Sequence, residues 1–226
     1  MIQYNLIRSR RKTLAIHVTK DAAVEVRAPL KMAKADIDRF VAEKEKWIET
    51  HLARQKLQNE KKSAFVLNIG DMIPLCGKLY PITSRVGNRA GFDGQSFYLP
   101  AELPPALIKV ALVRTYKILA KSILSERVGQ YKGLLKVTPA AINISGAKTR
   151  WGSCSGKNSI TFSWRLIMTD ENVIDYVVVH ELAHIMEHNH SVRFWKIVES
   201  VLPDYKNRQK ELKQFQKTFA AQDWET

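Results

Sequence analysis

Cysteine and long apolar runs are both scarce in this sequence. Only Cys76 and Cys154 occur among 226 residues, and they form neither a Cys-x-x-Cys motif nor a disulfide framework, which agrees with a reducing compartment. The longest apolar runs, such as the three valines before His180, fall far short of the roughly 20 residues that cross a bilayer. The opening MIQYNLIRSRRKT lacks the apolar core of a signal peptide. We therefore expect a cytoplasmic protein without a membrane segment.

Acidic residues are also fewer than basic residues, and the difference varies along the chain. Residues 1–62 hold 15 basic and 8 acidic residues (+7), residues 63–168 hold 14 and 4 (+10), and residues 169–226 hold 7 and 10 (−3). A basic surface favours nucleic acid, nucleotides or acidic protein partners, although it also serves solubility alone. The chain has no Walker-type glycine loop, no evident acidic cluster suited to Mg²⁺ and no internal repeat.

The apolar spacing predicts alternating groups of strands and helices. A β-hairpin is expected on either side of TKDAA (residues 19–23) and a helix of about six turns over 34–57. Short strands over 65–100, a proline-opened helix over 104–135 and two strands around SCSGKN (153–158) follow. The last predicted elements are a helix over 169–188, with Thr169 or Asp170 as N-cap, and a helical stretch over 192–219 broken near Pro203.

This order has no regular βαβ repeat, so it favours an α+β fold. We expect one domain over residues 1–226, with a basic β-rich N-terminal part (1–102) and a metal-binding catalytic part (103–226).

The strongest chemical signal is a histidine-rich segment. Four of the six histidines lie between residues 180 and 190, and His180-Glu181-x-x-His184 is the first part of that segment. At about 100° and 1.5 Å per residue, His180 and His184 lie one turn apart on the same helix face, where both imidazoles reach one tetrahedral Zn²⁺. Glu181 lies beside that face, in reach of an attacking water rather than the ion, as a general base must be.

The third ligand must come from another turn of the chain. His188 lies about 12 Å along the axis from His180 in an unbroken helix, too far to share an ion. His190 faces the ion only if the helix ends first. Asn189 tolerates the left-handed conformation that terminates helices, so a break near 188–189 is expected. We predict His190 as the third ligand and His188 as a supporting or surface residue.

Five motifs follow one another between Arg150 and Tyr205: RWGSCS, SWRLI, VIDYVVVHELAH, NHSVRFW and PDY. In this order and spacing, the segment resembles the YgjP-like metallopeptidase domain, a relative of the SprT-like and WLM zincins. The resemblance implies a zincin-like fold, with an active-site helix packed on a small mixed sheet and a basic N-terminal β-hairpin plus helix. It also implies that His180, His184 and His190 hold Zn²⁺ and that Glu181 is catalytic.

Three functions remain open at this point. The first is a zinc metallopeptidase acting on a peptide or protein, for which NSITFSWR (158–165) is a candidate edge strand unless it lies inside the sheet. The second is a metal-dependent nucleoside-triphosphate (UTP-like) pyrophosphatase, favoured by the +17 of residues 1–168. The third is a protease tethered to nucleic acid through the basic N-terminal part. Arg150 and Trp151 are candidate cleft residues, and Tyr205 is a candidate oxyanion donor.

Overall fold

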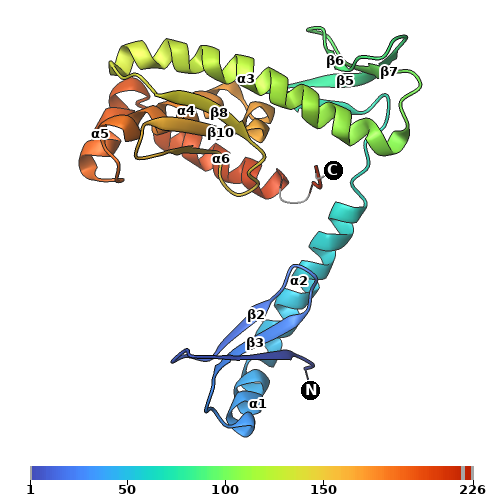
Figure 1. The fold of residues 1–226 in the computed structure, drawn as a ribbon, viewed down its shortest axis with the longest axis vertical. Coiled ribbons are helices and arrows are strands. Elements are labelled where there is room, and N and C mark those ends of the chain that lie inside the picture. Colours follow the sequence, from blue (N-terminus) through green and yellow to red (C-terminus); the bar gives the residue numbers. More distant parts are fainter. Residues whose placement is uncertain (1, 220–221, 225–226) are drawn as a thin grey trace. The chain divides into compact units, whose positions relative to one another are not determined.

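The computed structural model describes residues 2–219 and 222–224 (Figure 1). These residues form six α-helices, two 3-10 helices and ten strands in three small sheets, so the predicted α+β class is confirmed. None of the described helices is long and apolar enough to cross a membrane. The chain divides into two compact units. Of the described residues, the first unit comprises those up to Val66 together with Gln222 and Asp223, and the second comprises those from Leu67 to Phe219 together with Trp224.

The first unit is a three-stranded sheet covered by two helices. Its elements are β1 (Asn5–Ser9), β2 (Ala15–Val18), β3 (Val24–Pro29), α1 (Lys34–Glu43) and α2 (Glu45–Ser63). The expected hairpin is present as the antiparallel pair β2–β3, while β1, which was not predicted, pairs parallel to β3. The strand order is β1-β3-β2, so β2 is an edge strand. The hydrophobic core of this first unit consists of Val24, Val26, Ala28, Ile37, Val41 and Ile48.

The prediction of a single helix over residues 34–57 is wrong, because the structure has two helices there. They are separated at Lys44, whose backbone leaves the helical region (φ −102°, ψ 8°). The residue there is neither proline nor glycine, so local propensity gives no signal for the break.

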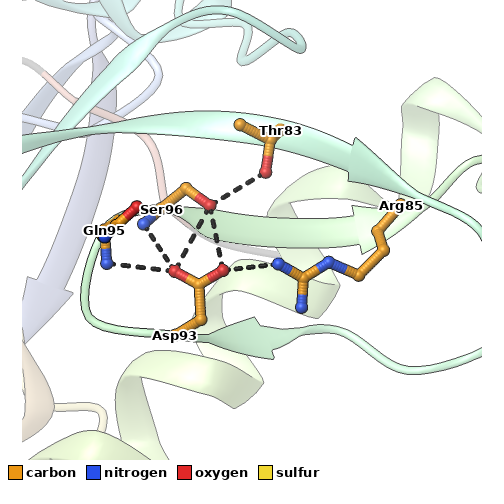
Figure 2. A network of polar contacts seen from close by, with 5 residues as sticks. All are labelled: Thr83, Arg85, Asp93, Gln95 and Ser96. Carbon is orange, nitrogen blue, oxygen red and sulfur yellow. Dashed lines mark hydrogen bonds and ion pairs between the residues drawn. The ribbon is translucent and has the colours of Figure 1, made fainter.

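The second unit begins with four short strands. They are β4 (Met72–Leu75), β5 (Lys78–Arg85), β6 (Gly91–Phe92) and β7 (Phe97–Pro100), in the order β4-β5-β7-β6. Figure 2 shows how the β6–β7 turn is fixed: the Asp93 carboxylate accepts hydrogen bonds from the backbone amides of Gln95 and Ser96 and pairs with Arg85. These bonds, led by that from Gln95, lower the pKa of Asp93 to about 2.

A long helix packs against both sheets of the second unit. The 3-10 turn η1 (Pro105–Leu107) leads into α3 (Ile108–Leu135), which ends at the left-handed Lys136. Along its length α3 contacts both β6 and β7 and, further on, α4 and β8 (Figure 1). The strands of residues 72–100 therefore belong with α3. The contacts within the chain divide it after residue 66. The expected single domain over residues 1–226, with its parts 1–102 and 103–226, stays a prediction.

The third sheet shows that residues 158–165 do not form the edge strand considered above. It consists of β8 (Ala141–Ser145), β9 (Gly152–Cys154) and β10 (Ser159–Ser163), followed by the buried 3-10 helix η2 (Trp164–Met168). The order is β8-β10-β9, with β8 parallel and β9 antiparallel to β10. The segment considered as an edge strand, β10, is therefore central, and β9 is at the edge. Ile160 and Phe162 of β10 are fully buried, which suits an interior strand.

Three helices complete the unit: α4 (Glu171–Met186), α5 (Val192–Val201) and α6 (Tyr205–Phe219). Asp170 is the N-cap residue of α4, as one of the two predicted candidates, although its side chain makes no capping hydrogen bond. The break expected near Pro203 is present between α5 and α6. Helix α4 packs against α3, β9, α5 and α6, so it lies in the middle of the unit.

Candidate metal centre

The central helix α4 presents the first two histidines. Ten of its sixteen residues are buried, including an uninterrupted run from Val173 to Val179. That apolar surface fixes the helix among its neighbours, so the polar residues that follow at its C-terminal end have defined positions. His180 and His184 are both partly buried there, one turn apart.

The turn after α4 brings the third histidine back. The helix ends at Met186 because Glu187 adopts an extended conformation (φ −143°, ψ 105°). The break thus falls slightly before the predicted position, and Asn189 does not terminate it by a left-handed conformation. Instead, Asn189 Oδ1 accepts a hydrogen bond from the Ser191 amide (2.9 Å), and Ser191 caps α5 through the Phe194 amide (3.3 Å). These bonds fix the turn that carries His190.

Three histidines meet at this point. The ring centroids of His180, His184 and His190 lie 4.9, 5.0 and 4.8 Å apart, and one nitrogen of each lies within 4.8 Å of the others. Nε2 of His180 lies 3.1 Å from Nε2 of His190. Two ligands of a tetrahedral Zn²⁺ would be about 3.4 Å apart at the usual bond length, so the pair needs little adjustment. His188 is exposed and lies outside this cluster.

The protonation states also suit metal binding. Burial, followed by the neighbouring His184 and His190, lowers the pKa of His180 to about 3, and burial lowers the pKa of His184 as well. Nδ1 of His184 donates to the Glu187 carbonyl (3.1 Å), which leaves its Nε2 for an ion. Nδ1 of His180 is buried without a hydrogen-bond partner among the described residues. Neutral imidazoles with free Nε2 atoms are the ligands that Zn²⁺ requires, so the residues fit the ion.

One aromatic ring supports all three histidines. The fully buried Phe194 of α5 packs against His180, His184 and His190 at centroid distances of 4.9, 4.5 and 4.8 Å. The sequence does not reveal this contact, because a pattern of apolar residues does not show which rings they touch.

Glu181, the residue after His180 on α4, lies against the edge strand β9. Its side chain is buried, and burial raises the pKa of its carboxyl group to about 7, partly offset by Arg150 and the Cys154 amide. A metal dication nearby would lower that pKa. A carboxyl group that titrates near neutrality is suited to exchanging protons during a reaction.

Gly152 of β9 makes room for this carboxylate. A Cβ atom at Gly152 would lie 2.6 Å from both Cγ and Oε1 of Glu181. No sequence pattern indicated this close approach, since Gly152 and Glu181 are distant in the chain. The glycine is therefore expected to set the position of Glu181.

Replacing Gly152 with alanine should displace Glu181 and lower kcat by about 100-fold, the scale on which a misplacement of about 1 Å acts. The metal should remain, because the three atoms nearest to the added Cβ all belong to Glu181 and none to a histidine. The measurement is kcat together with metal content. Gly156→Ala is the matched control: it lies in the adjoining β9–β10 turn, where an added Cβ would meet no heavy atom within 4 Å, and it should keep full activity. Full activity in Gly152→Ala, or loss of its metal, would contradict this role.

Trp151 and Tyr205, the other aromatic candidates, are held by packing against aromatic rings. Trp151 packs edge-on against Phe219 (5.9 Å), and Tyr205 stacks on Trp195, which stacks on His190. Cys154 is half-buried and is not part of the histidine cluster; burial and the charge of Glu181 raise the pKa of its thiol.

Comparisons with known proteins identify a family for this chain. The sequence profile of the YgjP-like metallopeptidase domain matches residues 12–215. Among solved structures, the metallopeptidase zymogen abylysin of Pyrococcus abyssi is 25% identical over 39% of this chain and 90% of its own, with a TM-score of 0.37. The zymogen jannalysin of Methanocaldococcus jannaschii is 24% identical over 42% of this chain and 96% of its own, also with a TM-score of 0.37. Comparison with curated proteins gives no match.

Two histidines of the cluster and the buried Glu181 lie on the same helix, an arrangement typical of metal-dependent hydrolases. Within that class the chain belongs to the YgjP-like metallopeptidase domain family, whose match spans most of its length.

Proposed function

We propose that this protein is a zinc-dependent metallopeptidase with a zincin-like arrangement, in which His180, His184 and His190 hold the ion and Glu181 is the general base. The observation that carries the proposal is the convergence of the three histidines beside a buried glutamate. Family membership supports the peptidase class. The three histidines would hold Zn²⁺, which would supply Lewis-acid chemistry to a substrate carbonyl and lower the pKa of a water molecule toward neutrality.

Glu181 supplies the proton transfer in this proposal. Its carboxylate takes a proton from the attacking water and holds it at an Oε atom until the leaving amine needs it. The low exposure of Glu181 keeps this carboxyl group away from bulk solvent, and the backbone of Gly152 and Cys154 restricts its movement.

The edge strand β9 favours a peptide substrate. Among the described residues, β9 pairs only with β10, and its Gly152 contacts Glu181. An extended peptide adding to the open side of β9 would make backbone hydrogen bonds next to the general base. The edge strand that pairs with a substrate, expected at residues 158–165, is thus proposed to be Gly152–Cys154 instead.

The test is product identification by mass spectrometry. Zinc-loaded protein is incubated with a mixed peptide library and, separately, with the common nucleoside triphosphates, with Glu181→Gln protein as the blank. New peptide termini that are missing from the blank support the peptidase. Release of pyrophosphate without any peptide cleavage would replace it with a nucleotide hydrolase that uses the same centre.

Removing the ion should destabilise the protein. A ligand present at roughly a thousandfold above its Kd contributes about 4 kcal/mol to the free energy of unfolding. For a chain of this size, that corresponds to a Tm lower by about 8–16 °C after chelation. Scanning calorimetry with and without chelator measures the shift. The same chelator should leave the Tm of His190→Ala nearly unchanged, and an equal shift in that variant would mean that the ion binds elsewhere.

A further inference from the structure

An aromatic and basic cleft in the first unit is separate from the metal centre. It lies between the edge strand β2 and α2, has a volume of about 470 Å³, and is lined by residues 16–18 on one side and by Trp47, His51 and Arg54 on the other. None of the residues lining it is acidic. The cleft lies wholly within residues 2–66.

Trp47 is the most unusual residue of this cleft. A tryptophan side chain usually lies in the core, yet Trp47 is 44% exposed. Its indole stacks on the imidazole of His51 at a centroid distance of 3.9 Å and an angle of 27°. Nδ1 of His51 donates to the Trp47 carbonyl (2.8 Å), so Nε2 is left as an acceptor on the same stack. The pair forms a preordered flat platform that is open to solvent.

The charges of α2 are segregated around this platform. At about 100° per residue, His51, Arg54, Gln58 and Lys61 all fall within about 40° of Trp47. The acidic residues of the helix, Glu45, Glu49 and Glu60, lie together on the far side. Arg54 is exposed and forms no ion pair with a described residue. One flank of the helix thus offers aromatic and cationic groups, without a carboxylate on α2 to compete.

The walls of the cleft are held in place. The side-chain amides of Gln55 and Asn59 both donate to the Lys20 carbonyl in the turn between β2 and β3 (3.4 and 2.8 Å). On β2, His17, which lines the cleft, lies opposite Glu25 of β3, and Glu25 is itself paired with Arg27. The Glu25 carboxylate is therefore already engaged by a cation.

We propose that this cleft binds single-stranded polynucleotide, with a base stacked on the Trp47–His51 platform and the phosphate backbone along Arg54. Stacking on an aromatic side chain combined with a cationic track is the way in which proteins bind single strands without sequence preference. The net charge of +7 on residues 1–62 complements the polyanion. An acidic peptide without aromatic or arginine side chains would pair with the cations but would leave the platform without a stacking partner.

The test measures fluorescence anisotropy of labelled oligo(dT) and oligo(rU) of about 15 nucleotides, a length near the site size of single-strand binders. The full chain carrying Glu181→Gln is used, so hydrolysis cannot interfere. Trp47→Ala should weaken binding by about tenfold, whereas Trp47→Phe, which keeps a stacking ring, should retain most of the affinity. A ratio between the two oligonucleotides distinguishes DNA from RNA.

Arg54→Gln and Lys56→Gln form a matched pair. Each removes one positive charge from an exposed position of α2, but Lys56 lies about 180° round the helix from Trp47, beside Glu45 and Glu49. Arg54→Gln should lower the slope of log affinity against log salt by about 0.7, the value for one single-strand phosphate contact, and Lys56→Gln should not change it.

Four results would overturn the proposal: no binding at low salt, equal losses in Arg54→Gln and Lys56→Gln, an unchanged affinity in Trp47→Ala, or equal affinity for a duplex of the same length. Preferential binding of an acidic peptide with the same ranking of variants would also overturn it and assign the cleft to a protein partner. Because binding is measured without turnover, the outcome is independent of the proposed peptidase activity.

Discussion

Glu181→Gln should lower kcat by about 10²- to 10⁴-fold, the range that general acid–base catalysis contributes, while the metal stays bound. Glutamine has nearly the same shape as glutamate but cannot accept the proton of the attacking water. The side chain is buried against β9, so the substitution keeps the volume that the packing requires. The three histidines are unchanged, and the affinity for Zn²⁺ should therefore be retained.

The measurement combines steady-state kinetics on a peptide identified by the library experiment with metal content by elemental analysis. Glu199→Gln is the control for the substitution itself, because Glu199 is an exposed residue of α5 and should tolerate the change without loss of kcat. Substantial activity in Glu181→Gln would mean that another group takes the proton. Loss of the metal would show instead that Glu181 contributes to binding the ion.

His190→Ala should weaken the affinity for Zn²⁺ at least about 100-fold, more than the 10- to 100-fold typical when a residue that only hydrogen-bonds to a metal ligand is lost. Its Nε2 lies 3.1 Å from that of His180, and its ring packs on Phe194 and Trp195. Without it, two histidines remain, one fewer than the three protein ligands usual at a catalytic zinc.

His188→Ala is the matched control, since it removes the same side chain two residues earlier on the same turn. His188 is exposed and outside the cluster, so its loss should leave the affinity unchanged. Competition against a chromophoric chelator gives both dissociation constants. A larger loss in His188→Ala than in His190→Ala would reverse the choice of third ligand.

The sequence by itself predicted the parts of this protein that depend on local geometry. Because a helix has 3.6 residues per turn, His180 and His184 lie one turn apart whatever surrounds them. The apolar residues before them indicated that this helix is buried. Alternation of apolar residues predicted the β2–β3 hairpin, and Pro203 indicated the break between α5 and α6. The family resemblance, carried by motifs between Arg150 and Tyr205, is confirmed by the match over residues 12–215.

Only the tertiary structure decided how segments distant in the chain meet. The break at Lys44, the central place of β10 and the contact between Gly152 and Glu181 have no local signature, because each depends on packing between elements. The position of His190 was anticipated from the need for a helix end, but the hydrogen bonds of Asn189 and Ser191 set it. Sequence periodicity determines which face of an element a residue occupies, whereas the partner of that face is chosen by the packing of the whole chain.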